Sequence, residues 1–283
     1  MEKKKIKEFE IVEKLKKLWE ENERKIKMRF LSETFPFLFS LPLPEIPPSF
    51  LERISNKFLK EFDWKKFEKR DFLESDLGLF LTVFLKKNVE NYIFSQKRKR
   101  IKEENIKPIE VHLKVKEVPI TLDYLGYQNR KLHLVIEGDC GGRIGEEMQN
   151  GKITVRGNCK DEVGSGMQGG KLIIEGNCGG GVGEGMQDGE IIVRGNCKDA
   201  PGVFMRGGKI TIEKDCEGWI EVVMWGGELN IKGEAKSFYE CAFSPTSRGI
   251  IIRKGVEIWR DGNWTKEGIE MRERGEIIVK QKN

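Results

Sequence analysis

The stretch Cys140-Gly-Gly-Arg-Ile-Gly-Glu-Glu-Met-Gln-Asn-Gly-Lys-Ile-Thr-Val-Arg-Gly-Asn158 decides the fold, because the chain repeats its plan at a fixed interval of 19 residues. Cysteine, methionine and glycine each recur with this step. The three series are Cys140, Cys159, Cys178, Cys197 and Cys216; Met148, Met167, Met186, Met205 and Met224; and Gly151, Gly170, Gly189, Gly208 and Gly227. A repeat this short and regular is one supersecondary unit stacked on copies of itself.

Each repeat also contains a short strand. Two apolar residues separated by one residue recur in every copy: Ile153 and Val155, Leu172 and Ile174, Ile191 and Val193, Ile210 and Ile212, Leu229 and Ile231. This alternation is typical of a strand, and the glycines around it exclude a helix. The sequence therefore predicts a mainly β protein, a right-handed parallel β-helix with 19-residue coils, preceded by an α-helical N-terminal domain. From Leu134 to Lys236 we expect about six coils, spaced about 4.8 Å apart.

The side chains of the repeat divide between the interior and the corners. The cysteines, the methionines and the apolar residue four positions after each cysteine are expected to point inward. Glycine is expected at corners that need a positive φ, namely Gly138, Gly157, Gly176, Gly195 and Gly233. The residues that follow these corners carry carboxylate or amide side chains that can bond to the backbone; they include Asp139, Asn158, Asn177, Asn196 and Asp215.

Three parts are expected along the chain. Residues 1–105 form an α-helical domain of unknown role, 106–236 the parallel β-helix, and 237–283 a C-terminal β cap and hairpin. In the first part we expect helices around Val12, after Ser49 and from about Ser75, with an extended crossing at the prolines between the first two. Runs 109–115 and 119–122 are strand-like, and 256–265 is a hairpin around Asp261-Gly262.

Composition limits the class of protein. The chain has 283 residues, no run of 18 apolar residues and a charged N-terminus, Met-Glu-Lys-Lys-Lys, so we predict a soluble cytoplasmic protein without a membrane segment. The six cysteines fit this location, because five of them belong to one interior column. The 34% content of charged residues, mostly Lys and Glu, is typical of a thermophile.

The segments Val163-Gly-Ser-Gly-Met-Gln-Gly-Gly170 and Val182-Gly-Glu-Gly-Met-Gln-Asp-Gly189 resemble the Gly-Xaa-Gly-Xaa-Gly β-helix family. That family includes the C-terminal domain of the glutamate synthase large subunit and one of the subunits of formylmethanofuran dehydrogenase. The resemblance covers about residues 109–236. It implies a structural element that holds catalytic domains or subunits in place, rather than a place where chemistry occurs.

The residue types that could carry chemistry favour a structural interpretation. The cysteine column could bind a soft metal, but identical small side chains in every coil are better explained as filling of a narrow interior. Zinc would need a Cys-Xaa-Xaa-Cys motif or histidine partners, and the only histidines, His112 and His133, lie in strand-like alternation. The glycine-rich loops open no helix, and Asp161 and Asp199 are two coils apart. We therefore predict no catalytic residue, no cofactor and no metal.

A docking surface is expected in the last two coils, where the outward-facing residues differ in type from those of the earlier coils. The residues three, seven and nine positions after each cysteine should face outward, and in the last two coils they become apolar or aromatic. An exposed patch of this kind is typical of a docking site; the alternative, which we favour, is that the C-terminal hairpin folds over it, at least in part. The candidate patch is Phe204, Arg206, Trp219, Val223 and Trp225.

The function that these observations favour is a non-catalytic scaffold or assembly subunit with protein partners or a homo-oligomeric state. One alternative is an enzyme subunit that uses the coil surface, for formyl transfer or as a carbohydrate-active β-helix; carboxylates lining a groove beside the coils would favour it. The other is a nucleic-acid-binding module in residues 1–105, where Lys97-Arg-Lys-Arg100 is basic. Nucleic acid is the less favoured partner, because no basic stripe interleaved with aromatic residues accompanies that stretch.

Overall fold

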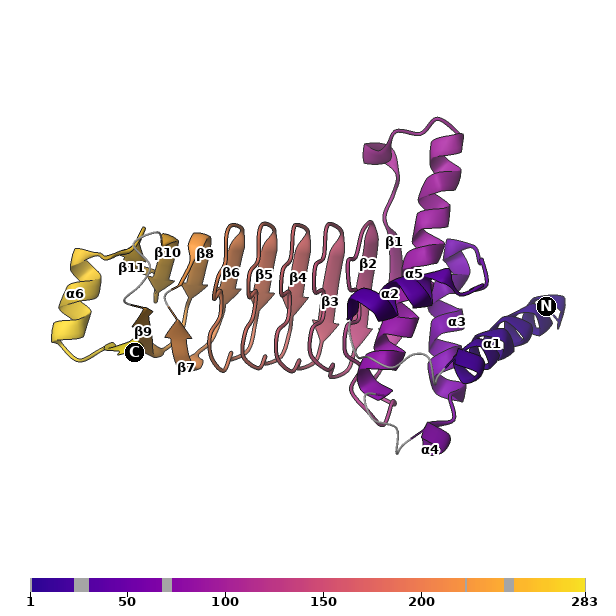
Figure 1. The fold of residues 1–283 in the computed structure, drawn as a ribbon, viewed down its shortest axis with the longest axis horizontal. Coiled ribbons are helices and arrows are strands. Elements are labelled where there is room, and N and C mark those ends of the chain that lie inside the picture. The colour runs from indigo at the N-terminus through magenta and orange to yellow at the C-terminus, as the bar shows by residue number, and fades with distance from the viewer. Residues whose placement is uncertain (1, 23–30, 68–72, 222, 242–246, 283) are drawn as a thin grey trace.

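The computed structural model describes residues 2–22, 31–67, 73–221, 223–241 and 247–282, and shows helices at one end of a long row of stacked strands (Figure 1). The helices before the strands are α1 (Glu2–Asn22), α2 (Leu31–Ser40), α3 (Pro48–Glu61), α4 (Trp64–Phe67) and α5 (Leu73–Arg98), followed by a 3₁₀ turn, Glu103–Asn105. No helix among the residues described is long and apolar enough to cross a bilayer.

Apolar spacing accounts for three of these helices. Val12, Leu15 and Trp19 are buried on one face of α1, as the sequence predicts. Helix α3 begins at Pro48, since proline is compatible with the first turn of a helix, and α5 carries the predicted apolar stripe. Helix α2 was not predicted. It contains Pro36, whose missing amide normally ends a helix.

The strands form one long parallel ladder and a smaller sheet beside it. The ladder runs in the order β1 (Ile109–Lys114), β2 (Leu132–Glu137), β3 (Lys152–Arg156), β4 (Lys171–Ile174), β5 (Glu190–Val193), β6 (Lys209–Ile212), β8 (Trp225–Ile231) and β10 (Arg248–Arg253). The smaller sheet has the order β13 (Ile278–Lys282), β9 (Ala235–Cys241) and β7 (Cys216–Glu221), again parallel. The register from β2 to β8 advances by 19 residues, as when Lys152 pairs with Lys171. The predicted parallel β-helix is therefore confirmed.

The solenoid has about seven turns. Six strands of the ladder, β2 to β6 and β8, lie in the segment where about six coils are expected. Outside that segment, β1 and β10 each extend the ladder by one strand, one at either end. The first turn takes a step of 23 residues, since Ile109 pairs with Leu132, and the last turn takes a step of 22 along most of its length, since Ile251 pairs with Leu229. Both end turns therefore escape the 19-residue pattern. The first turn also has Thr121 and Asn129 where later coils have cysteine and methionine.

The apolar run 119–122 is not a strand, contrary to expectation. Its apolar character serves packing instead, because Leu122 is completely buried at the entrance to the first coil. The carbonyl of Leu122 accepts a single hydrogen bond from the amide of Gly141 in the next coil. A run of apolar residues without regular alternation does not distinguish a strand from a buried loop.

The interior columns agree with the sequence. All five repeat methionines are completely buried, and the five repeat cysteines are buried and free of disulfides. The paired strand residues, such as Ile153 and Val155, are also fully buried. Identical side chains thus stack along the axis of the solenoid and form a continuous core.

One corner of the coil is held by a ladder of side chains. The Oδ1 atom of each residue in this column accepts the backbone N–H of its counterpart in the following coil: Asp139 from Asn158 (2.7 Å), Asn158 from Asn177 (2.9 Å), Asn177 from Asn196 (2.8 Å), Asn196 from Asp215 (3.3 Å) and Asp215 from Glu234 (2.7 Å). The predicted bonding of these side chains to the backbone is confirmed.

The corner glycines need a different explanation from the one that the sequence suggested. Gly138 has a positive φ of 125°, but Gly157, Gly176, Gly195 and Gly233 do not. A Cβ at Gly176 would lie 2.5 Å from the carbonyl oxygen of Gly157, and one at Gly195 would lie 2.4 Å from that of Gly176. Close approach of successive coils, rather than φ, therefore requires glycine at these four corners.

Helix α3 covers the open edge of β1. The Asn56 amide donates to the carbonyl of His112 (2.7 Å) and its Oδ1 accepts the N–H of Lys114 (2.8 Å), while Glu52 accepts the N–H of His112 (3.2 Å). These side chains replace the strand that is missing on this side. They protect the N-terminal edge of the solenoid from pairing with another chain.

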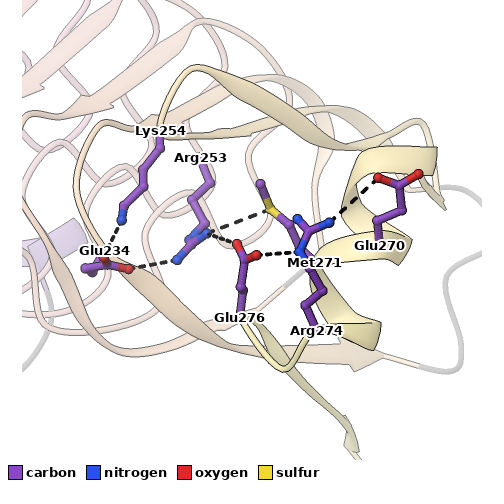
Figure 2. Close-up of polar contacts among 7 residues, drawn as sticks. All are labelled: Glu234, Arg253, Lys254, Glu270, Met271, Arg274 and Glu276. Carbon is purple, nitrogen blue, oxygen red and sulfur yellow. Dashed lines mark hydrogen bonds and ion pairs between the residues drawn. The ribbon is translucent and has the colours of Figure 1, made fainter.

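The C-terminal end is closed by a small cap. It consists of β11 (Val256–Arg260) and β12 (Asn263–Trp264), which form the predicted antiparallel hairpin, then helix α6 (Lys266–Glu273) and β13. Figure 2 shows the polar cluster that joins this cap to the last coil: the buried Arg253 contacts Glu234 and Glu276, and Lys254 bonds to Glu234 as well. Helix α6 was not predicted. Its N-cap is Thr265, whose side chain accepts the N–H of Gly268.

Candidate docking surface on the last coils

Phe204 occupies a corner that normally suits glycine. Its φ is 56°, in the left-handed region, and the equivalent residues of the two preceding coils are Gly166 and Gly185. A bulky side chain with this φ is an outlier that costs about 1–2 kcal/mol. The side chain is also 42% exposed, so burial in the core does not offset this cost.

Trp225 lies beside Phe204 on the surface. The two ring centroids are 5.8 Å apart, and Trp225 is 43% exposed. Together they form an aromatic pair that crosses from one coil to the next. Exposed aromatic pairs of this kind are typical of the centre of a protein–protein interface.

Arginines flank Trp225 along the stacking direction. The guanidinium of Arg206 lies 4.9 Å from the centroid of the Trp225 ring, and Arg248 is the ladder partner of Trp225 on the other side. Arg206 and Arg248 are both exposed. Arg206 forms no ion pair with a carboxylate in the part of the chain that the structure describes. The charge of Arg206 beside the aromatic pair is thus available to a partner.

Of the other two candidate residues, Trp219 is partly covered and Val223 is buried. Trp219 stacks on Tyr239 of β9 at a centroid distance of 4.2 Å, and Lys280 of β13 lies 5.1 Å from the Trp219 ring. Val223 is only 8% exposed. The covering residues come from β9 and β13 rather than from the hairpin. The exposed surface is therefore Phe204, Arg206 and Trp225, which we call the aromatic patch.

Sequence reasoning missed two residues of this region, Arg248 and Tyr239. Both follow the last copy of the 19-residue repeat, so no fixed spacing placed them beside Trp225 or Trp219. The apolar run Ile250-Ile-Ile-Arg253 is strand-like, but it does not indicate the register of β10 against β8.

The cysteine column has the properties of a packed interior. Neighbouring thiols and burial raise the pKa values of Cys159 and Cys197 well above the usual range, which disfavours the thiolate that metals and electrophiles require. The Cys197 thiol donates to the carbonyl of Gly179, at 3.4 Å. No group of three potential ligands gathers around a metal position within the described residues.

Asp161 supports the coil backbone and does not pair with Asp199. Asp161 Oδ1 accepts the N–H of Gly180 in the next coil at 2.8 Å. A Cβ at Gly180 would lie 2.0 Å from Asp199 Oδ1, so glycine separates the two acidic residues. The alternation of aspartate and glycine along this column is explained by these close contacts.

The basic stretch Lys97-Arg-Lys-Arg100 lies at the end of α5. Lys97 pairs with Glu103 at 2.6 Å, and the guanidinium of Arg98 lies 5.9 Å from the ring of Phe94. Two of these cations are therefore engaged within the chain.

No protein-family model matches this chain, and no curated protein sequence matches it.

Proposed function

We propose that the chain is a non-catalytic scaffold or assembly subunit that binds a protein partner through the aromatic patch. The observation that carries this proposal is Phe204, a strained residue whose exposed ring pairs with Trp225. Strained conformations persist where function requires them. A flat, rigid solenoid surface with two aromatic anchors and a cationic rim suits a folded partner.

The charge of the patch favours a partner with acidic side chains around an apolar centre. Arg206 lies 4.9 Å from the centroid of the Trp225 ring, and a carboxylate of the partner could reach its guanidinium beside the ring. Complementary charge of this kind mainly increases the rate and the specificity of association.

The nature of the partner follows from the resemblance to the Gly-Xaa-Gly-Xaa-Gly family. We propose an oxidoreductase or amidotransferase complex of the glutamate synthase or formylmethanofuran dehydrogenase kind, in which this chain positions catalytic subunits. Because one fold supports many functions, the partner is identified by the experiment below.

Three further properties belong to the same proposal. The coils wind in the right-handed sense, as connections between parallel strands usually do. The chain resides in the cytoplasm, which its five free interior cysteines support. Its source is a thermophile, which the ion pairs between successive coils support, such as Lys171–Glu190 and Lys209–Glu228 at 2.5 and 2.8 Å.

The test compares three purified, tagged proteins in lysate of the source organism. They are the wild type, the double variant Phe204→Ser/Trp225→Ser, and Ile269→Ser, which removes an exposed apolar side chain of α6 that is 46% exposed. We expect one protein to be retained by the wild type and by the Ile269 variant but lost by the double variant, and to re-form a complex of fixed stoichiometry from purified components. Equal retention by all three, or self-association through the patch, would contradict the proposal.

A further inference from the structure

The corner that leads into β3 contains the dipeptide Asn150-Gly151 (Figure 1). No other asparagine in the sequence is followed by glycine. An asparagine side chain is open to attack by the nitrogen of the next residue. Glycine at that place favours the attack, because it has no Cβ to hinder the approach of its nitrogen.

The Asn150 side chain lies against the nitrogen that would attack it. The N–H of Gly151 donates to Asn150 Oδ1 at 2.6 Å, so the carbonyl carbon bonded to this oxygen lies beside the Gly151 nitrogen. The same N–H makes no second hydrogen bond within the part of the chain that the structure describes. No bond between coils therefore has to break before this nitrogen reacts.

The backbone on both sides of this contact is held by the neighbouring coils. The N–H of Asn150 donates to the carbonyl of Asn129, and the carbonyl of Gly151 accepts the N–H of Lys171, both at 3.1 Å. The Asn150 side chain itself is exposed, so water reaches it. Two groups that are held in contact react faster than the same groups on a free chain.

An equivalent corner two coils later contains the acid that would result. There the dipeptide is Asp188-Gly189, and the N–H of Gly189 donates to Asp188 Oδ1 at 2.7 Å. The coil therefore accommodates aspartate in the contact that Asn150 makes. Isoaspartate, which adds one carbon to the main chain, has little room, because even a Cβ on Gly151 would lie 2.7 Å from the carbonyl oxygen of Leu132.

We propose that Asn150 is a site of spontaneous deamidation in the folded protein, with water as the co-reactant. The Gly151 nitrogen loses its proton to hydroxide and bonds to the side-chain carbonyl carbon of Asn150, which closes a succinimide ring. The bond from this carbon to Nδ2 breaks, and Nδ2 takes up a proton and leaves as ammonia. Water then opens the ring at either carbonyl, so the net reaction converts asparagine and water into aspartate or isoaspartate and ammonia.

The reaction adds one negative charge to the corner before β3. It involves neither the aromatic patch nor the scaffold function, so either proposal can fail without the other.

The experiment incubates the full-length protein in mildly alkaline buffer and maps its peptides by mass spectrometry. We expect conversion of the Asn150 amide to an acid at a rate that rises with pH, since the nitrogen reacts in its deprotonated form. The variant Asn150→Gln should lose this conversion completely, because a glutamine side chain would have to close a larger ring. Asn263→Gln changes an exposed asparagine that precedes Trp264, and as the matched control it should keep the conversion.

A second measurement separates reaction in the fold from reaction in rare unfolded molecules. The conversion rate is compared between native buffer and unfolding urea at the same pH. Reaction through unfolded molecules alone would make the native rate at least about 10³-fold lower, because the folding equilibrium constant has that size or more. We expect a smaller difference, since the coil holds the reacting atoms in contact.

The variant Asn150→Asp carries the product directly and should unfold at the same urea concentration as the wild type, as the Asp188 corner indicates. Three results would overturn the proposal. They are a native rate at least about 10³-fold below the rate in urea, conversion that persists unchanged in Asn150→Gln, and a clear loss of stability in Asn150→Asp, which would show that the folded corner rejects the product.

Discussion

Arg253 and Glu234 form an ion pair 2.7 Å long between the end of β10 and the corner before β9 (Figure 2). The Arg253 side chain is only 4% exposed, whereas that of Glu234 is 43% exposed. The same guanidinium lies 3.9 Å from Glu276, which follows α6, and 3.8 Å from the sulfur of Met271. A buried cation thus joins the last coil to the C-terminal cap.

Removal of both acidic partners should destabilise the cap more than removal of the arginine. The variant Glu234→Gln/Glu276→Gln leaves Arg253 buried without a carboxylate, and we expect a loss of about 3 kcal/mol, the lower end of the cost of an unpaired buried charge. Arg253→Met keeps much of the buried volume and removes the charge, so it should be close to neutral. Urea unfolding of the three proteins measures both effects. A loss in Arg253→Met as large as in the double variant would refute the buried-charge explanation.

The ion pair should also weaken in acid. The hydrogen bond from Lys254, together with the charges of Lys254 and Arg253, holds the pKa of Glu234 below its usual value of 4.5. Because the pKa is lower in the folded state, the stabilisation is complete above the unfolded value and is lost as the pH falls through the folded value. We expect the difference in unfolding midpoint between the wild type and Glu234→Gln to be constant near neutral pH and to shrink below pH 4.5. Glu273→Gln, an exposed acidic residue of α6, is the control and should show no such trend.

The two kinds of glycine in the coil should respond differently to alanine. At Gly176 a Cβ would lie 2.5 Å from a backbone oxygen, whereas at Gly185, with a φ of 63°, it would meet nothing within 4 Å. We expect Gly185→Ala to cost about 1 kcal/mol, from the left-handed backbone alone, and Gly176→Ala to cost about 3 kcal/mol, as severe overpacking does. Thermal unfolding of the two variants checks the order. Equal losses would mean that coil spacing adjusts freely.

The interior thiols should be inert until the solenoid opens. Burial and neighbouring thiols raise the pKa of Cys159 and of Cys197, and reaction requires the thiolate. In a Cys241→Ser background, which leaves only the five column cysteines, we expect labelling by a disulfide reagent to follow the urea unfolding curve. Rapid labelling of one or more cysteines in the native protein would show that the column opens to solvent.

Sequence reasoning was effective where one pattern repeats. The spacing of Cys140 and its counterparts predicted the parallel ladder and the buried columns, because stacked copies bury the same positions. It failed where the pattern ends: the first turn has Thr121 and Asn129 at the signature positions, and the last turn is longer. At Gly176 the sequence suggested a positive φ as the reason for glycine. The actual reason is the contact with the carbonyl of Gly157, which forms only between stacked coils and cannot be seen in the sequence of one coil.

The candidate site shows the same division. The alternation of inward and outward side chains along the coil indicated that Phe204 and Trp225 face outward, and both are exposed. The covering of Trp219 depends on Tyr239 and Lys280, which belong to strands outside the repeat. Tyr124, which is buried, lies in the turn that the 19-residue signature missed. Contacts between the repeat and segments outside it follow no fixed sequence spacing, so the sequence does not predict them.

Phe204 offers a test that separates stability from docking. Alanine normally stabilises a chain relative to glycine, because glycine has more freedom in the unfolded state. At Phe204, with its φ of 56°, we expect the reverse: Phe204→Gly should be more stable than Phe204→Ala by about 1 kcal/mol, since only glycine relieves the left-handed strain.

If Phe204→Gly is also at least as stable as the wild type in urea unfolding, the fold gains nothing from the ring, and docking remains as the reason for it. The same variant should then lose the partner that the wild type retains. Strong destabilisation of Phe204→Gly would instead show that the contact between the Phe204 and Trp225 rings is structural. It would remove the main support for the docking surface.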